Sequence, residues 1–336
     1  MTLNNIIRIG FLSILFFSCN RIQIDVDASD INIDTKYINL DSCIYNSNEK
    51  DLIKNHNTFK NNIKDIYSYQ LGYILQIGNV SDTAFIKSIT QYKNDPGIQK
   101  IEKRIKEKFN NLEKHKLQIN EGLKHLKYHF PKGKIPENIV FMNSLLQSNA
   151  FCTEKEIGIG LDRYLGQKID VIKELPSEPF YDWIKESMDV QFLERDALCS
   201  WIITHYIEED KGTLAESIIR WGKIIYLTEA SFPNYEKNII IRYSINDYNW
   251  AIKNEYTFWK YLVDQKLLFK NNELDKANLL KEAPFTTGLP NESPDRFAQF
   301  IGWQIVRNYM SKNEITLEQL LKVPYNNILQ EYEIKD

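Results

Sequence analysis

Residues 95–131, DPGIQKIEKRIKEKFNNLEKHKLQINEGLKHLKYHFP, carry the most regular hydrophobic pattern of the chain. Apolar residues recur at intervals of seven with further ones between them, which is typical of a long amphipathic helix. Asp95 can cap the first amide groups, Pro96 suits the first turn, and Pro131 ends the pattern. We therefore predict one helix from Asp95 to Phe130. Its nearly coiled-coil stripe consists of Ile98, Ile105, Leu112, Ile119 and Leu126.

Such a stripe could pair with another chain, but burial against the same protein is the commoner outcome, and we expect it here. Beyond it, residues 139–142 and 156–161 have the pattern of strands, joined through a polar turn near 147–149. Helical periodicity occupies most of the remaining chain, in the segments 49–77, 81–92, 188–207, 213–227, 246–266, 294–310 and 317 to the end, with a further helical start at Pro179. The pattern predicts an α+β fold that is predominantly helical, with a small central β-sheet.

Composition narrows the function classes. The 336 residues are 43% hydrophobic and 26% charged, as in a folded globular protein. The net charge of -3 includes no excess of lysine and arginine to neutralise a phosphate backbone, so we expect no nucleic-acid partner. Because no spacer rich in Pro, Gly or Ser divides the chain, we predict a single helix-rich domain over residues 37–336.

The amino-terminal residues have the features of a secretory signal. Arg8 gives a positive start, and an apolar run from Ile9 to Phe17 is too short to cross a bilayer. The run LFFSC at 15–19 resembles a relaxed bacterial lipobox. We predict a signal peptide at 1–18, lipidation of Cys19 by fatty acyl chains such as palmitate, and a tether over 19–36. An ordinary cleaved signal followed by a chance cysteine is the alternative.

A search for catalytic patterns finds none that is complete. The chain has no His-Glu-x-x-His motif. His125 and His129 flank Leu126 of the apolar stripe, so we predict that both histidines are half-exposed beside the buried stripe. An acid and base pair of the glycosidase type could come from four carboxylates, namely Glu154, Glu156, Glu194 and Asp196. A position on charged helix faces explains these residues more simply. We predict no catalytic residues, no metal ligands and no cofactor.

Three segments from residue 160 onward carry a family resemblance. GLDRYLG at 160–166, GKIIY at 222–226 leading to Pro233, and 292–310 resemble the gliding-motility lipoprotein GldB family of the Bacteroidetes. The resemblance implies a membrane-anchored component needed for movement over surfaces, in a system that shares parts with a secretion apparatus. It also implies a distant zincin-like single domain whose metal site is lost. Here Leu193 to His205 lacks the zinc motif, and Trp221 precedes Gly222 where the zincin comparison would place a carboxylate.

The same blocks supply the candidate site. Ser293-Pro294 predicts a helix start, and the residues after it have the spacing of a core-facing helix. Five residues of these blocks are candidates for a structural role or a partner contact: Asp162, Arg163, Arg296, Trp303 and Arg307.

Taken together, these features favour a non-catalytic, periplasm-facing lipoprotein on the cell membrane or outer membrane. Its expected partners are other gliding-motility or secretion-machinery proteins of the cell envelope, and the membrane itself through the lipid anchor. A zincin-like metallopeptidase or other envelope hydrolase is the alternative. A solute-binding lipoprotein is a third possibility, which predicts a deep cleft between two lobes.

Overall fold

The computed structural model describes residues 24–78, 84–209 and 212–332. The predicted signal peptide and Cys19 lie outside these residues. Ile24 and Ala28 are buried, and the first strand begins at Lys36, so the packed part of the chain begins within the segment 19–36 that we predicted as a tether. Among the described residues, no helix combines the length and the hydropathy needed to cross a bilayer.

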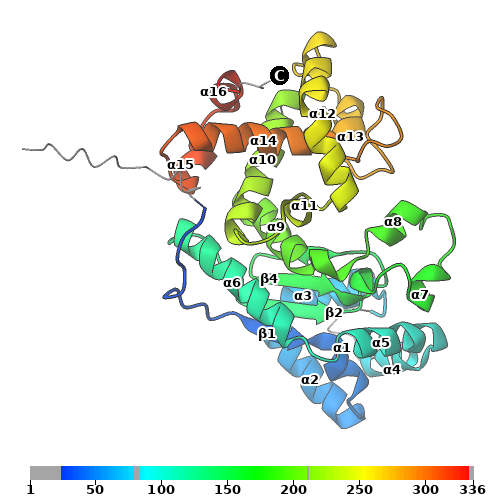
Figure 1. The fold of residues 1–336 in the computed structure, drawn as a ribbon. Helices are drawn as coiled ribbons and strands as arrows, with labels where there is room; N and C mark the ends of the chain where they lie inside the picture. Colours follow the sequence, from blue (N-terminus) through cyan, green and yellow to red (C-terminus); the bar gives the residue numbers. More distant parts are fainter. Residues whose placement is uncertain (1–23, 79–83, 210–211, 333–336) are drawn as a thin grey trace, which may run out of the picture.

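The sheet has four strands in the order β1-β2-β4-β3, of which Figure 1 labels β1, β2 and β4. β1 (Lys36–Asn39), β2 (Asn138–Met142) and β4 (Glu156–Gly160) are parallel, whereas β3 (Ala150–Cys152) is antiparallel to β4. The two predicted strands are therefore confirmed. β3 directly follows the turn predicted near 147–149 and was not predicted, because its three residues are too few to show a strand periodicity.

Alternate residues of β2 serve two hydrophobic cores. Val140 and Met142 pack with the helices that follow β1, whereas Ile139 and Phe141 belong to the larger core on the other face. The helices that follow β1 and pack with Val140 and Met142 are α1 (Leu40–Tyr45), α2 (Glu49–Asn62), α3 (Lys64–Tyr69), the π-helix η1 (Gln70–Ile74) and α4 (Phe85–Asn94). The single helix predicted over 49–77 is thus wrong: the chain changes direction at Ile63, whose φ is -137°.

The single helix predicted from Asp95 to Phe130 is also wrong. It is two helices, α5 (Pro96–Lys108) and α6 (Glu113–His129), separated by Phe109 to Leu112. The side chain of Asn111 accepts a hydrogen bond from the backbone N–H of Glu113 at 2.9 Å, an alternative to the helical pattern that asparagine favours. The expected burial of the stripe is confirmed for Ile105, Leu112, Ile119 and Leu126.

The rest of the chain is helical. Two 3₁₀-helices, η2 (Leu161–Tyr164) and η3 (Val190–Phe192), accompany α7 (Asp170–Lys173), α8 (Asp182–Glu186), α9 (Leu193–His205), α10 (Leu214–Ser231), α11 (Lys237–Ile241), α12 (Ile245–Asp264), α13 (Glu273–Leu280), α14 (Phe297–Lys312), α15 (Leu317–Lys322) and α16 (Tyr325–Gln330). α9 packs on β3 and β4. The abundance of helices around one small sheet confirms the predominantly helical α+β class.

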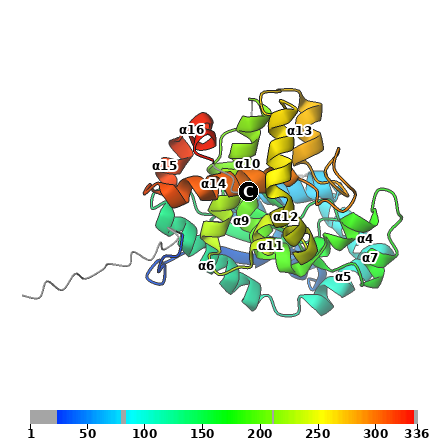
Figure 2. The ribbon, with the colours of Figure 1, turned by 45° about the horizontal axis from the view of Figure 1, so that its top comes forward.

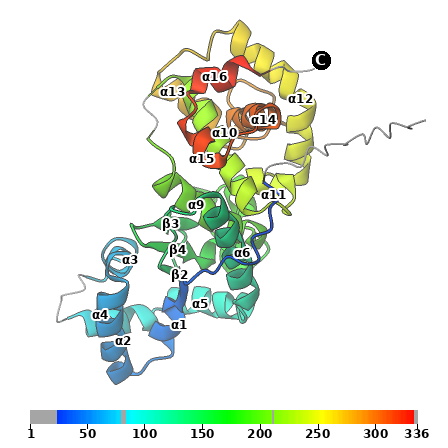
Figure 3. The same cartoon turned by 90° about the vertical axis from the view of Figure 1, so that its left-hand side faces the viewer.

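The α10 and α14 helices form the centre of the carboxyl-terminal part. Figure 3 shows them inside a ring of α12, α13, α15 and α16, and Figure 2 shows α9 and α11 below the pair. Thr213 and Glu216 form a capping box that begins α10. The predicted start of α14 at Ser293-Pro294 is wrong: the helix begins at Phe297, whose N–H is capped by the Thr286 hydroxyl at 3.1 Å.

Candidate functional site

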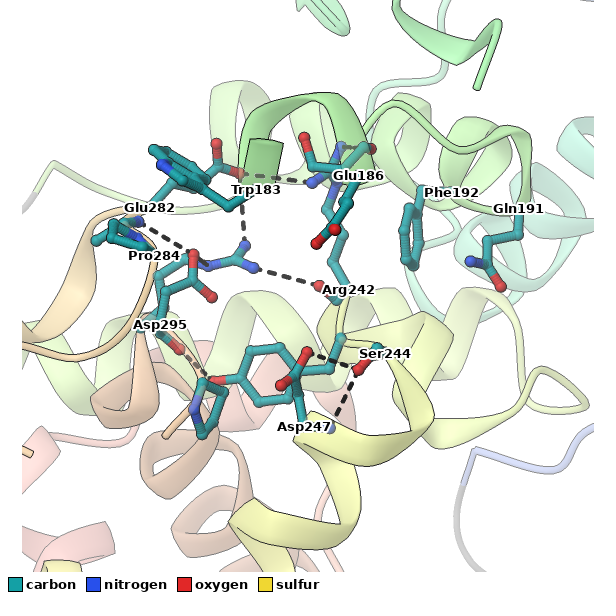
Figure 4. Close-up of a pocket in the computed structure, with 15 residues that line it drawn as sticks. Trp183, Glu186, Gln191, Phe192, Arg242, Ser244, Asp247, Glu282, Pro284 and Asp295 are labelled. Carbon is teal, nitrogen blue, oxygen red and sulfur yellow. Dashed lines mark hydrogen bonds and ion pairs between the residues drawn. The ribbon is translucent and has the colours of Figure 1, made fainter. Parts of the chain in front are cut away.

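A cavity of about 240 Å³ lies where four segments meet, and we call it the arginine pocket (Figure 4). Its walls come from α8 and η3, from the turn between α11 and α12, and from the loop between α13 and α14. Two arginines from different segments, Arg242 and Arg296, line it. Only Arg296 was among the residues that the sequence analysis singled out.

Arg242 directly follows α11 in the left-handed region, with φ 63°. Its Nε donates to both carboxylate oxygens of Asp196 at 3.1 and 3.0 Å, and its Nη2 donates to the carbonyl of Ser187 at 3.0 Å. The guanidinium also lies over the ring of Phe192, 5.0 Å from the centroid. A strained backbone conformation held by this many contacts is typical of functional sites.

Arg296 has the same kind of backbone, with φ 51° just before α14. Its Nε donates to Asp295 at 2.9 Å, and its Nη2 donates to the carbonyl of Arg242 at 3.2 Å. Burial alone would lower the pKa of the Arg296 guanidinium, but Asp295 and Glu282 raise it above its ordinary value. Arg296 is therefore a permanent buried cation, as guanidinium groups generally are.

Glu282 lies between the two arginines. Its Oε1 is 3.7 Å from Nη1 of Arg242 and 3.6 Å from Nη1 of Arg296, while its side chain is 49% exposed. Both distances are ion-pair distances that exceed the length of a good hydrogen bond. The Nη1 atoms of both guanidinium groups therefore lie within ion-pair distance of the same half-exposed carboxylate, that of Glu282, which Figure 4 labels among the residues that line the pocket.

Asp196 connects the pocket to Arg163. Asn149 accepts a hydrogen bond from Arg163 Nε at 2.7 Å and donates one to Asp196 at 3.2 Å. Burial by itself raises the pKa of Asp196. The neighbouring cations Arg242 and Arg195 lower this pKa by more than burial raises it, so the pKa of Asp196 lies below its ordinary value. Asp196 is accordingly the ionised centre of this network.

The interpretation of four carboxylates as charged helix faces is wrong for three of them. Glu156, Glu194 and Asp196 are 4%, 4% and 5% exposed, and only Glu154 is exposed. Glu194 pairs with Nδ1 of His115 at 2.6 Å. Buried carboxylates require such partners, because an unpaired buried charge is costly.

Trp303 and Arg307 meet on one carboxylate at the interface of α10 and α14. Glu229 is fully buried and accepts a hydrogen bond from Trp303 Nε1 at 2.7 Å. Lys237 Nζ lies 2.7 Å from its Oε1 as an ion pair without hydrogen-bond geometry, and Arg307 Nε lies 3.6 Å from its Oε2. The guanidinium of Arg307 lies over the Trp303 ring at 5.1 Å. These contacts join α10 to α14 and, through Lys237, to α11.

Asp162 is fully buried just past the end of β4 and contacts a turn rather than an arginine side chain. It accepts hydrogen bonds from the backbone N–H of Ser144 at 2.8 Å, from the Ser144 hydroxyl, and from the backbone N–H of Leu146. Burial is the main cause that raises its pKa. Asp162 and Arg163 therefore lie in separate networks although they are neighbours in sequence.

Sequence reasoning missed Arg242, Glu282 and Glu229. A signal existed for two of them, since Arg242 follows three isoleucines and Glu229 lies inside the apolar run of α10. A charged residue in such surroundings is buried with a partner or ends the apolar run. Glu282 had no signal, because its surroundings are those of an ordinary polar loop.

Within the ranges that the structure describes, no three His, Cys, Asp or Glu side chains are grouped closely enough to hold a metal ion. The predicted arrangement of His125 and His129 is confirmed: both are half-buried on α6, and Leu126 between them is in the core.

Nε2 of His205 is 3.0 Å from the carbonyl oxygen of Thr153. The cysteines Cys43, Cys152 and Cys199 are free thiols.

Fold and site together define a predominantly helical α+β protein in which two buried arginines face a small, partly closed pocket. The chain belongs to the family of the gliding motility protein GldB, whose family model matches residues 21–335. No curated protein and no solved structure matched the chain. Membership implies a role in gliding motility, and the family's lipoprotein designation fits attachment to a membrane. The zincin-like ancestry stays a prediction.

Proposed function

We propose that this protein is a membrane-anchored lipoprotein of the gliding apparatus that acts without catalysis, by binding other proteins of a gliding or secretion assembly. The observation that carries the proposal, beyond family membership, is the arginine pocket. A guanidinium group is always charged and presents fixed donors, which suits recognition of an anionic group better than proton transfer.

The proposed anchor is lipid on Cys19, with the body facing the periplasm from the cell membrane or the outer membrane. Because Ile24 is buried, only the four residues 20–23 separate Cys19 from the packed body, so five Cα–Cα steps join Cys19 to Ile24. Such a link spans at most about 18 Å when fully extended. A lipid-anchored body would therefore stay close to the membrane surface, where a membrane-embedded partner can reach it.

The anchor is tested by comparing the native protein with a Cys19→Ser form in gliding cells. We expect the native protein to fractionate with membranes and to recover envelope proteins by affinity capture. The serine form should lose membrane association and motility together. Equal localisation and equal motility of the two forms would contradict lipidation of Cys19.

The non-catalytic mode needs a separate test, since a zincin-like metallopeptidase or other envelope hydrolase is the competing function. Purified protein should contain no stoichiometric zinc and should cleave neither peptide nor glycan substrates. Bound zinc that disappears together with a measurable activity when its ligands are replaced would overturn the binding proposal.

A further inference from the structure

In the arginine pocket, the side chains of Arg242 and Arg296 are firmly held by hydrogen bonds, whereas Glu282 is held only weakly. The side chains of Arg242 and Arg296 are 5% and 10% exposed. Each is fixed through Nε and Nη2, which leaves both Nη1 groups directed at the same oxygen of Glu282. Cations held in this way lose little further conformational entropy when an anion binds.

The carboxylate of Glu282 can be displaced from the two arginines by another carboxylate, because its contacts with them are weak. Its side chain is half exposed, it lies in the loop that follows α13, and its two contacts with the arginines are longer than charge-assisted hydrogen bonds. The contribution of these ion pairs is small, because they are long and solvent screens the half-exposed carboxylate. Another carboxylate that approached the Nη1 groups more closely would therefore displace Glu282 at small cost.

The remaining walls restrict what can enter. Trp183, Phe192 and Pro284 supply apolar surface, while Glu186 and Asp247 add negative charge. A ligand with several negative charges would be repelled by these acids, whereas a single carboxylate on an aliphatic stem meets both the cations and the apolar surface. The cavity volume of about 240 Å³ is below the range of pockets for drug-sized ligands. It suits one side chain.

We infer that the arginine pocket receives one acidic side chain, Asp or Glu, of a partner protein, and that Glu282 closes the pocket by occupying it when the partner is absent. The inference rests on the proposed binding function and names the chemistry of the partner. An acidic side chain is the occupant because the group now facing the arginines is itself a glutamate side chain.

The decisive experiment is a calorimetric titration of the full-length protein with the peptide acetyl-Ala-Glu-Ala-amide. Glu282→Gln removes the competing charge and should increase affinity about tenfold, because a site that is mostly occupied internally binds with reduced apparent affinity. Glu292→Gln is the matched control, since it removes a carboxylate from an exposed position of the same loop outside the pocket. Its affinity should equal that of the wild type.

Ligand controls separate the sources of the anion. Acetyl-Ala-Gln-Ala-amide should not bind, and inorganic phosphate should bind more weakly than the glutamate peptide. A peptide ending in a free carboxylate, acetyl-Ala-Ala-Ala, tests the chain end; tighter binding of this peptide would overturn the assignment to a side chain. Arg296→Gln should abolish binding of the glutamate peptide, with circular dichroism to verify the fold.

The inference is wrong if Glu282→Gln binds the glutamate peptide no better than the wild type does. This outcome differs from failure of the proposed function, because affinity capture would still recover partners through another surface. If the proposed function is correct, the same substitution should also increase the yield of captured partners from gliding cells.

Discussion

Gly222 of α10 and Gly302 of α14 place the backbones of two helices in direct contact. A β-carbon on Gly222 would lie 2.1 Å from the carbonyl oxygen of Gly302, and one on Gly302 would lie 2.0 Å from the carbonyl oxygen of Ile218. Both obstacles are backbone atoms, which cannot rotate away. Two of the segments that carry the family resemblance therefore meet at a crossing that only glycine allows.

Gly222→Ala should destabilise the protein by about 3 kcal/mol or more, because overpacking against backbone forces the two helices apart. Urea unfolding of the variant and the wild type measures the difference. The matched control is Gly72→Ala, an exposed helical position whose new β-carbon would have an ordinary 3.8 Å contact. That control should leave stability unchanged or slightly raised. Equal effects of the two substitutions would contradict the crossing.

Glu229→Ala should cost about 3 kcal/mol of folding stability, since it leaves the buried Trp303 indole N–H without its acceptor and removes the partner of Lys237. A double-mutant cycle with Trp303→Phe tests the cause. If the hydrogen bond carries the effect, the double variant should be more stable than the sum of the single losses predicts. Additive losses would show that the two side chains act independently.

Asp196→Ala should be among the most destabilising single changes, at about 4 kcal/mol, because it strands Arg242 and Arg195 as buried cations. Asp196→Asn keeps the shape and part of the hydrogen bonding, so its loss should be smaller. Thermal unfolding at one pH ranks the two variants. A loss in the alanine variant no larger than that of a typical surface substitution would argue against an ionised Asp196.

Glu102 should make the protein less stable as the pH rises from about 4.5 to about 7. Burial raises the pKa of Glu102 from 4.5 to about 7, although a hydrogen bond from Asn143 opposes the rise. In that interval the folded chain holds a proton that the unfolded chain has released, so the free energy of unfolding decreases with increasing pH. Glu102→Gln should remove this part of the pH dependence. An unchanged profile would contradict it.

His129 should act in the opposite direction. Burial lowers the pKa of His129 from 6.5 to about 4, and the neighbouring His125 adds to the shift. Between these values the unfolded chain binds a proton that the folded chain does not, so stability falls as the pH decreases from about 6.5 to about 4. Unfolding of His129→Gln across this range should show a shallower acid slope. A slope as steep as that of the wild type would show that His129 does not titrate in this way.

Local patterns predicted the type of most elements correctly. The capped helix after Thr213 and the apolar strands near Val140 and Ile159 have strong short-range signals, and each lies where the pattern predicts. Helix ends were less predictable. The breaks at Ile63 and after Lys108 fall inside continuous helical periodicity, because both halves face a core and the stripe continues across the turn.

The candidate site was predictable only in part, for a related reason. Arg296 was among the five candidates from the sequence, and it does line the pocket. Its partners Arg242 and Glu282 come from other segments, and no local spacing relates them. Trp303 and Arg307 are one helical turn apart, but the carboxylate that joins them, Glu229, lies on a different helix.

The sequence alone was sufficient for the helical class, the small sheet and the family, because each depends on residues that are close together along the chain. The tertiary structure alone decided where helices break, which strands run parallel and which charges meet. Those outcomes depend on the path of the whole chain: Arg242, Glu282 and Arg296 form one site only because the turn after α11 and the loop after α13 fold against each other.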